Sequence, residues 1–470
     1  MESKTFFNLF ENIQVGFLVN SLNVVAGDMR LDSSHFVDDS NIVLNCKIQF
    51  KPLIDFIDGV EEPKLFTRIY CDEEYGLPYI SSSEMSQIEP PVNSRFISKT
   101  LTVNINQYKI KRGQILVSAA GTVGSIVLAT KELDGVAGTS DILRINVDAK
   151  TNLGFVYTYL ASSFGANELA NLAYGAIIKR VRGFQLSDLK TPIIDHDNKL
   201  KMNELVLAAL DNRDKANILI KQSRQLVLKH NNLPELLQIK KQTLFRITNL
   251  SEFTDDYRLD SHFYNAMAEE AAQNIQYFSN DFRKLKDDIT EKIYYLNRFT
   301  RTFVEKGFGI PYMAGKDIIK IRPIDVSYLS SSVTQGLDDY RLKRGWILMT
   351  CSGTSSGSLG STCLIHKNYE NWVGTHDLIR IVSKHDFDSG YLYAFLSSDY
   401  GYYQTLRYKH GAVIDHLTPE QVAEVLIPIP SKVQQNQIGD LVRQAYDLRA
   451  EAIRLEDEAQ SLLTKILTKE

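Results

Sequence analysis

The chain carries one ten-residue sequence twice, first as Tyr108-Lys109-Ile110-Lys111-Arg112-Gly113-Gln114-Ile115-Leu116-Val117 and again as Tyr340-Arg341-Leu342-Lys343-Arg344-Gly345-Trp346-Ile347-Leu348-Met349. A loop of small residues follows each copy, at 118–124 and 350–357. Short apolar runs bounded by glycine are typical of buried strands, so we predict strands at Ile115–Val117 and Ile347–Met349. The recurrence indicates that two parts of the chain share one structure.

The repeat extends over most of the sequence. Upstream, Phe66-Thr67-Arg68 and Gly76-Leu77-Pro78-Tyr79 return as Phe299-Thr300-Arg301 and Gly309-Ile310-Pro311-Tyr312, and Arg30–Phe36 returns as Arg258–Phe263. Downstream, Gly138-Thr139-Ser140-Asp141 returns as Gly374-Thr375-His376-Asp377, and one offset of 236 residues then holds from Tyr157/Tyr393 to Pro192/Pro428. Short helices are predicted at Val156–Ser163 and Tyr391–Ser398, so each copy is a mixed α+β domain.

The composition is that of an ordinary globular protein, with 44% hydrophobic and 23% charged residues in a chain of 470. A net charge of −4 argues against a simple polybasic DNA-binding protein, although a local basic cleft stays compatible with it. Apolar runs such as Val123–Ala129 are too short for the roughly 20 residues of a membrane span. Four separated cysteines (Cys46, Cys71, Cys351 and Cys363) indicate reduced thiols of a cytoplasmic protein rather than metal ligands.

A long helix with a heptad register is predicted after each copy. After the second copy, apolar residues alternate spacings of three and four at Ile438, Leu441, Ala445, Leu448, Ala452, Leu455, Ala459, Leu462 and Ile466. Such a pattern over four heptads is typical of a coiled coil. The offset of 236 gives a poorer seam after the first copy, at Met202, Leu205, Ala209, Asn212, Ala216, Leu219, Ser223, Leu226 and His230, and Leu233-Pro234 then ends the helix.

We predict that these two helices pair with each other as an antiparallel coiled coil. Alanine at every second seam position leaves room for close approach, and antiparallel pairing brings the end of the first helix near the start of the second. An α+β domain then lies at each end of a rod of roughly 43 Å, and the domains are related by a pseudo-twofold axis. The alternative is that each helix is amphipathic and lies on a single domain.

With these features the sequence resembles the specificity (S) subunit of type I restriction–modification systems. The motifs that carry the resemblance, besides the repeat, are Arg112-Gly113-Gln114-Ile115-Leu116 and Leu426-Ile427-Pro428-Ile429-Pro430 with Gln434-Gln435 after it. The resemblance implies two target-recognition domains, at 1–198 and 233–430, separated by helical spacer regions at 199–232 and 431–470. Each domain would read one half of a split DNA target. The first copy departs from the motif, because Pro192–Asp197 lacks the second proline and the glutamine pair.

The resemblance also implies partners and cofactors. The expected partners are double-stranded DNA, two methyltransferase subunits and the restriction/translocase subunits, and no membrane. We expect S-adenosylmethionine, ATP and magnesium to bind only to the partner subunits. The target sequence, the length of its spacer and the partner stoichiometry cannot be read from the chain.

Motifs for catalysis and cofactor binding are missing from the sequence. Pro90-Pro91 lacks the preceding Asn or Asp and the following aromatic residue that hold a flipped base for methylation. Gly315-Lys316 is followed by Asp317, where a P-loop requires Ser or Thr. No His-Glu-x-x-His occurs, and Gly121-Thr122-Val123-Gly124 is more typical of a tight turn than of a phosphate cradle. We therefore expect a non-catalytic chain without a metal site.

Basic residues beside aromatic or glycine-containing turns are the candidates for DNA contact, because Lys and Arg neutralise phosphates and Arg reads guanine. The candidates are Lys111, Arg112, Lys179, Arg180 and Arg182 in the first copy, and Lys343, Arg344, Arg407, Lys409 and His410 in the second. The alternative for each is a solvated surface charge. Residues shared by both copies, such as Arg144 and Arg380, are expected to be structural or phosphate-binding. Residues that differ, such as Arg180 against His416, are expected to carry the base code.

Two other functions remain open from the sequence. The chain can be an S-type subunit of a type II enzyme whose partner is a fused nuclease–methyltransferase. It can also be a structural adaptor that uses the helices to join proteins without DNA. Co-purification of partners would separate the first from a type I subunit, and salt-dependent binding to duplex DNA would exclude the second.

Overall fold

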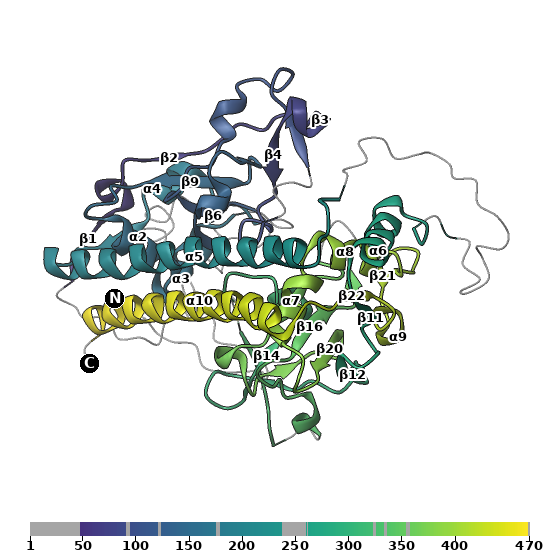
Figure 1. Ribbon diagram of the computed structural model, residues 1–470. Coiled ribbons are helices and arrows are strands. Elements are labelled where there is room, and N and C mark those ends of the chain that lie inside the picture. The colour runs from purple at the N-terminus through teal and green to yellow at the C-terminus, as the bar shows by residue number, and fades with distance from the viewer. Residues whose placement is uncertain are drawn as a thin grey trace. The chain divides into compact units, whose positions relative to one another are not determined.

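A computed structural model describes residues 48–90, 95–120, 124–174, 179–236, 260, 262–322, 326–332, 336–353 and 358–468 (Figure 1). The repeated block Arg30–Phe36, most of its copy at 258–263 and the loop residues Gly121–Val123 lie outside the described residues. The chain forms two compact units. The first comprises residues 1–86, 90–210 and 454–470, and the second comprises 87–89 and 211–453.

The part of the first unit that the structure describes contains two four-stranded sheets and one strand pair. The larger sheet has the order β2 (Gly59–Glu61), β9 (Ile142–Asn146), β6 (Ile115–Ser118), β7 (Ile126–Leu128). The smaller sheet has the order β3 (Tyr70–Cys71), β5 (Phe96–Ser98), β4 (Gly76–Ile80), β8 (Ala137–Gly138). Strands β1 (Phe50–Pro52) and β10 (Lys190–Pro192) pair antiparallel. The helices of its described residues, apart from the long one described below, are α2 (Leu153–Ala161), α3 (Ser163–Leu172) and α4 (Gly183–Ser187).

The second unit repeats this topology. Its larger sheet has the order β12 (Thr290–Tyr294), β20 (Leu378–Ser383), β16 (Ile347–Thr350), β18 (Thr362–Leu364). Its smaller sheet has the order β13 (Phe303–Val304), β15 (Ser327–Leu329), β14 (Ile310–Met313), β19 (Val373–Gly374). Two strand pairs follow, β11 (Phe282–Lys284) with β22 (Leu426–Pro428) and β17 (Ser352–Gly353) with β21 (Asp415–His416). The helices are α6 (Ala266–Phe278), α7 (Ser389–Leu396), α8 (Asp399–Leu406) and α9 (Pro419–Val422).

Short 3-10 helices connect several of these strands. They span Leu53–Phe56, Glu73–Tyr75, Ile105–Tyr108 and Lys131–Leu133 in the first unit, and Gly315–Asp317, Leu337–Tyr340 and Lys367–Tyr369 in the second. The predicted strands are confirmed as β6 and β16, and the predicted short helices as α2 and α7. Both α2 and α7 are buried on nearly all sides, as expected of helices that lie inside a core.

The same cap begins the next helix of each unit. Ser162 accepts a hydrogen bond from the Gly165 amide at 3.3 Å, and Ser398 accepts one from the Gly401 amide at 3.5 Å. A serine side chain at this position satisfies an amide that the first helical turn leaves without a partner. The offset of 236 residues found in the sequence therefore reports equivalent positions in the fold.

Two helices are much longer than the others, α5 (His196–His230) and α10 (Lys432–Leu467). Part of each belongs to each unit. In the first unit Met202 and Val206 of α5 share a core with Ala459 and Leu463 of α10. In the second unit Ala216 and Ile220 share a core with Ile438 and Val442. Neither of these helices combines the length and the apolarity that a membrane crossing needs, and no other helix in the described part of the chain does so.

All twelve predicted seam residues are buried or half-buried; these are Leu205, Ala209, Ala216, Leu219, Leu226, Leu441, Ala445, Leu448, Ala452, Leu455, Ala459 and Leu462. The buried face of α10 is wider than the seam, since Val442, Tyr446 and Leu463 are buried as well. A helix that packs against both another helix and a domain needs more than a two-position stripe. In the second unit, His230 near the end of α5 bonds Gln434 at 3.1 Å and Gln437 at 3.2 Å near the start of α10.

Helix α10 also lies against α7 in the second unit. A Cβ atom at Gly390 would lie 2.7 Å from the Gly439 Cα, so neither glycine leaves room for a side chain. Beside them, Asp388 caps α7 by accepting from the Tyr391 amide at 2.9 Å and bonds the Arg443 guanidinium at 3.1 and 3.2 Å. Close backbone approach and a cap that doubles as an ion pair fix α7 on α10.

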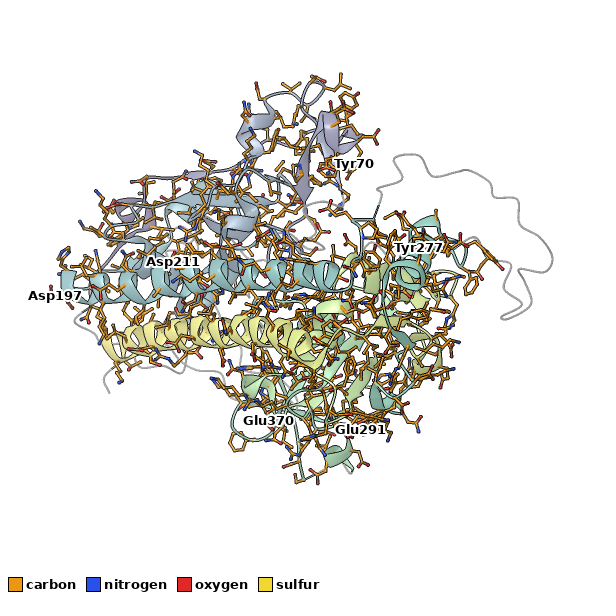
Figure 2. The ribbon with its side chains drawn as sticks, in the orientation of Figure 1. Tyr70, Asp197, Asp211, Tyr277, Glu291 and Glu370 are labelled. Carbon is orange, nitrogen blue, oxygen red and sulfur yellow. The ribbon has the colours of Figure 1, made fainter. Side chains whose placement is uncertain are left out.

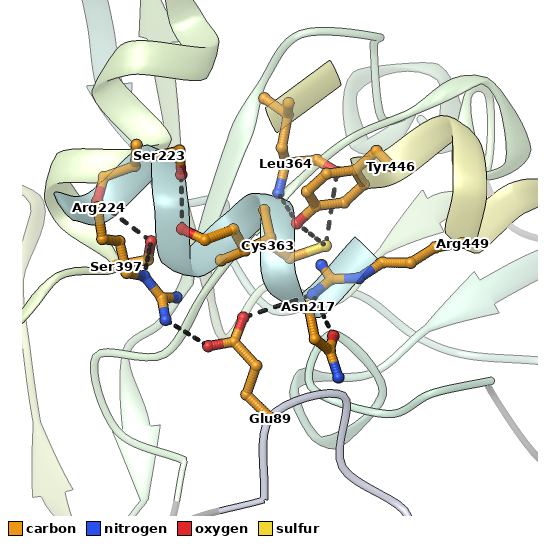
Figure 3. Close-up of polar contacts among 11 residues, drawn as sticks. Glu89, Asn217, Ser223, Arg224, Cys363, Leu364, Ser397, Tyr446 and Arg449 are labelled. Carbon is orange, nitrogen blue, oxygen red and sulfur yellow. Dashed lines mark hydrogen bonds and ion pairs between the residues drawn. The ribbon is translucent and has the colours of Figure 1, made fainter. Parts of the chain in front are cut away.

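A carboxylate joins the two long helices in the second unit (Figure 3). Glu89 accepts from Arg224 of α5 at 2.5 Å and from Arg449 of α10 at 3.5 Å, while Arg449 also donates to Asn217 at 3.3 Å. Glu89, Arg224 and Arg449 line a cavity of about 180 Å³. Burial raises the pKa of Glu89, but the two guanidinium groups outweigh it and hold the pKa below its ordinary value.

Candidate nucleic-acid interface

Four predicted DNA-contact residues lie in the turns that precede the central strands. Lys111 and Arg112 come just before β6, and Lys343 and Arg344 come just before β16; all four are exposed. The Arg112 amide donates to Asp134 at 3.2 Å, and the Lys343 ammonium lies 5.6 Å from the centroid of the Trp346 ring. A left-handed glycine follows each pair, with φ of +84° at both Gly113 and Gly345. The turn is the same in both units.

The other candidates of the first unit lie beyond the opposite end of β6. Arg180 bonds Asp141 at 3.0 Å, and its backbone pairs with Tyr174 and Ala120. Arg182 forms an ion pair with Glu62 at 2.7 Å, and hydrogen bonding to Tyr174 together with the charge of Glu62 raises its pKa. Lys179 is exposed. Two of the three cations thus contact carboxylates of their own domain.

The equivalent region of the second unit follows α8. The Arg407 guanidinium carbon lies 4.3 Å from the centroid of the Phe263 ring, and Lys409, which is largely buried, bonds Asp415 at 3.1 Å. His410 is exposed and pairs through its backbone with His416, whose side chain bonds Ser352 at 3.0 Å. The backbone pairing of His410 with His416 matches that of Tyr174 with Arg180.

The structure therefore separates the ten candidates into two groups in each unit. In the second unit, Lys343 and Arg344 precede β16, whereas His416 pairs with Ser352 just after it. The first unit has the same division around β6, because Arg180 pairs with Ala120. The two groups lie at opposite ends of one strand, and they do not form a single cluster.

Arg144 and Arg380, which the two copies share, are structural. Both are almost fully buried. Arg380 donates to the carbonyl oxygens of Leu378, Gly374 and Thr375 at 3.0–3.3 Å. Arg144 donates to backbone carbonyls and forms an ion pair with Glu61 at 3.3 Å. Arg380 satisfies carbonyl groups of the turn between β19 and β20, and Arg144 satisfies those of Gln107 and Lys109 in the segment that leads to β6. Their burial and these bonds favour the structural role of the two that the sequence left open.

The small sheet of the first unit carries a cation–aromatic cluster that the sequence did not predict, although two of its residues, Arg68 and Tyr79, belong to the repeated motifs. The guanidinium carbons of Arg68 and Arg95 lie 5.9 and 5.7 Å from the centroid of the Tyr79 ring. Tyr70 contacts the same ring edge-to-face at 6.3 Å and lies at the surface, 53% exposed (Figure 2). Arg95 also pairs with Glu84. Arg68 and Tyr70 are thereby presented to solvent on a rigid aromatic base.

The second unit carries the equivalent cluster. Arg301 donates to the Tyr312 hydroxyl at 3.0 Å, and its guanidinium carbon lies 6.0 Å from the ring centroid. Phe303 contacts Tyr312 edge-to-face at 6.0 Å and is 54% exposed. Two further residues extend this cluster: the Arg298 Nε donates to the His376 Nε2 at 3.2 Å, and the charge of Arg301 acts on the same imidazole. Exposed arginines beside exposed aromatic rings suit both phosphates and bases.

The small sheet positions each cluster through its own apolar core. In the first unit Tyr79, Ile97, Tyr108 and Ala137 form that core, with Phe66 packed against Tyr108 at a centroid distance of 4.1 Å. In the second unit Tyr312, Leu329, Tyr340 and Val373 form it, with Phe299 and Tyr340 at 4.2 Å. The Tyr108 and Tyr340 hydroxyls donate to the carbonyls of Lys64 and Asn297. The packed core of each small sheet therefore holds the aromatic ring of its cluster in place.

Over the residues that the structure describes, no group of three or more His, Cys, Asp or Glu side chains could hold a metal ion. Cys71, Cys351 and Cys363 are free thiols, and burial raises the pKa of Cys363 to about 11. A thiol with a raised pKa is a poor nucleophile.

Comparison with known proteins gave one family and several solved structures. The model of the family described as "Type I restriction modification DNA specificity domain" matches residues 47–230 and 305–458. The S subunit of a type I restriction–modification system from M. genitalium is 14% identical, with a TM-score of 0.35 over 93% of this chain and 99% of that one. The HsdS subunit from Thermoanaerobacter tengcongensis is 13% identical, with a TM-score of 0.28 over 92% and 100%.

A third solved structure, described as the structural basis of complex assembly and conformational transition of the type I R-M system, is 14% identical. Its TM-score is 0.26 over 91% of this chain and 99% of that one. No curated protein sequence matches the chain. The family model covers well over half of the residues and both copies of the repeat. The chain therefore belongs to the family of type I restriction–modification DNA specificity domains.

Proposed function

We propose that this chain is the non-catalytic DNA-recognition subunit of a type I restriction–modification complex. Its two target-recognition domains, at residues 1–198 and 233–430, each read one half of a bipartite DNA target. The observation that carries the proposal is the cation–aromatic cluster that recurs on the small sheet, Arg68 with Tyr79 and Arg301 with Tyr312. Guanidinium groups neutralise phosphates and read bases, and exposed rings add contact with the sugar or base.

In this proposal α5 and α10 form an antiparallel coiled coil, which serves as the spacer between the domains. The spacer regions are residues 199–232 and 431–470, and a pseudo-twofold axis relates the two halves. The shared cores of α5 and α10 in each unit support it, as does the contact of His230 with Gln434 and Gln437. A rigid spacer would fix the number of unspecified base pairs between the half-sites.

The helices would also dock two methyltransferase subunits and, through them, the restriction/translocase subunits. S-adenosylmethionine, ATP and magnesium would bind to those partners, because this chain carries no motif for them. The specificity chain alone would then neither methylate nor cut DNA.

The test is to express the chain with and without its methyltransferase partner and map adenine methylation across a genome. We expect one bipartite motif, modified only when both proteins are present. Binding of the complex to that motif should weaken steeply with salt, with a slope that corresponds to several phosphates. Binding that ignores salt, or a complex that recognises no DNA, would favour a protein adaptor instead. A fused nuclease–methyltransferase as sole partner would favour a type II assembly.

A further inference from the structure

One pair in the second cluster has no counterpart in the first. At the offsets of the repeat, Leu65 stands where the second copy has Arg298, and Ser140 stands where it has His376. Leu65 is 85% exposed, so the first unit exposes an apolar side chain where the second exposes an arginine. Arg301 and Tyr312, by contrast, are shared as Arg68 and Tyr79. If two half-sites differ in sequence, the residues that differ between their readers are the ones that distinguish bases.

The Arg298 side chain is exposed and held at one atom. Its Nε donates to the His376 Nε2 at 3.2 Å, and the imidazole is 11% exposed. Among the residues that the structure describes, Arg298 forms no ion pair with a carboxylate. Its two terminal amino groups therefore stay available for a ligand, while the hydrogen bond at Nε limits the rotation of the guanidinium plane. Such pre-orientation lowers the entropy that a long side chain loses on binding.

His376 has polar neighbours at both ring nitrogens. Its Nε2 lies 3.1 Å from Asp377 Oδ1 and its Nδ1 lies 3.5 Å from the Thr375 hydroxyl. Burial lowers the pKa of His376; the charges of Arg298, Arg301 and Arg380 lower it further, and Asp377 opposes them. A neutral ring with its proton on Nδ1 accepts at Nε2 from Arg298, and the positive charge of Arg298 offsets the unfavourable approach of the Asp377 oxygen to the same nitrogen. The ring is thus a positioning group for Arg298, which itself faces the solvent.

We propose that Arg298, oriented by His376, reads a guanine in the half-site recognised by the second domain. The terminal amino groups of an arginine match the O6 and N7 acceptors of guanine in the major groove, which is the commonest base-specific contact of this side chain. Arg301, stacked on Tyr312 and shared with the first copy, contacts the phosphate backbone instead. The first domain, with Leu65 and Ser140 at the equivalent positions, makes no such guanine contact. This inference rests on the proposed function.

The experiment uses the complex of this chain with its methyltransferase partner. The preferred target is first selected from a random DNA library, and each guanine of the second half-site is then replaced by 7-deazaguanine, which lacks the N7 acceptor. We expect one position at which the replacement weakens binding by about 10-fold or more. Arg298→Ala should weaken binding to the unmodified target by about 10- to 100-fold and should make binding indifferent to 7-deazaguanine at that position.

Matched variants separate reading from positioning and from general charge. Arg301→Ala should weaken binding to all sequences alike and lower the salt slope by about one phosphate. His376→Ser should weaken the preference for guanine at the same position. His376→Gln keeps an acceptor near the place of Nε2 and should therefore retain most of that preference. Thermal unfolding of each complex confirms that the variants fold.

The outcomes distinguish the two proposals. If the unaltered complex binds specifically and Arg298→Ala keeps its guanine preference, the assignment of Arg298 is wrong while the proposed function stands. A selected second half-site with no guanine sensitive to 7-deaza replacement would also overturn the assignment. If the unaltered complex shows no sequence-specific binding, the proposed function fails as well.

Discussion

In the second unit Glu89 forms ion pairs with two arginines, Arg224 and Arg449. We expect these ion pairs to contribute measurably to the free energy of unfolding. The Glu89 side chain is 37% exposed, so solvent screens part of the attraction. Glu89→Gln keeps the shape and removes the charge, which leaves Arg449 largely buried beside Asn217. We expect the free energy of unfolding at neutral pH to fall by about 1–2 kcal/mol, measured by urea denaturation. Glu458→Gln, in an exposed pair with Arg454, is the control and should change little.

The same pair predicts a dependence on pH. The pKa of Glu89 is lowered in the folded protein, so its contribution is complete above the ordinary carboxyl pKa. The contribution is lost as the pH falls through the lowered value, because the folded protein must then bind a proton too. The difference in stability between the native chain and Glu89→Gln should therefore shrink on acidification. A difference that stays constant down to strongly acidic pH would mean that the charge of Glu89 contributes nothing.

Among the helices, a substitution at Gly439 of α10 would have two opposite effects, a gain in helix propensity and a loss of packing. In an isolated helix, glycine to alanine gains about 1 kcal/mol. In α10 the new Cβ would lie 1.9 Å from the Asp388 carboxylate, which caps α7 and bonds Arg443. Displacing that carboxylate costs the cap and the ion pair, so we expect Gly439→Ala to destabilise the protein by about 1–3 kcal/mol. Gln444→Ala, on the exposed side of the same helix, should be neutral or slightly stabilising in the same thermal melts.

Ala452 tests the heptad register that the sequence predicts. It is fully buried, and leucine would add three carbons where the helix face is closely packed. We expect Ala452→Leu to cost about 1–3 kcal/mol and to weaken assembly with the partner subunits. Gln444→Leu adds a similar apolar side chain on the exposed face and should leave both properties unchanged. A fully stable Ala452→Leu chain that assembles normally would contradict the close packing.

The elements also show how far sequence reasoning reached. Strands β6 and β16 were predictable because an apolar run between glycines needs burial, and the long helices were predictable because their apolar pattern persists over four heptads. The small sheets were not, since β3, β8, β13 and β19 have only two residues each and carry no period. Their clusters depend on pairing between distant segments, such as Tyr312 with Val373. Arg298 and His376 are 78 positions apart, and no local pattern joins them. The repeated Phe-Thr-Arg and Pro-Tyr motifs were the one signal available.

For the whole molecule, the proposed spacer should act as a ruler. Removing one heptad from each helix, Ala209–Lys215 together with Ala445–Glu451, keeps the seam register and shortens each helix by about 10 Å. At ~3.4 Å per base pair, that corresponds to about three base pairs of DNA. We expect the shortened chain to select targets whose unspecified spacer is about three base pairs shorter, with the same half-sites, when binders are sequenced from a library of spacer lengths. An unchanged spacer in a folded, DNA-binding deletion would show that another feature sets the distance.

The division of α10 between the two units has a consequence for biosynthesis. The core of the first unit contains Met202 and Val206 from α5, and it is completed by Ala459, Leu463 and Leu467. The ribosome must therefore translate all of residues 211–453 before that core can close. At ~5–20 residues per second, the delay is on the order of ten seconds or more. Throughout that time the nascent first domain exposes an apolar stripe, which makes it a natural client for chaperones, whereas the main segment of the second unit, residues 211–453, is made without interruption.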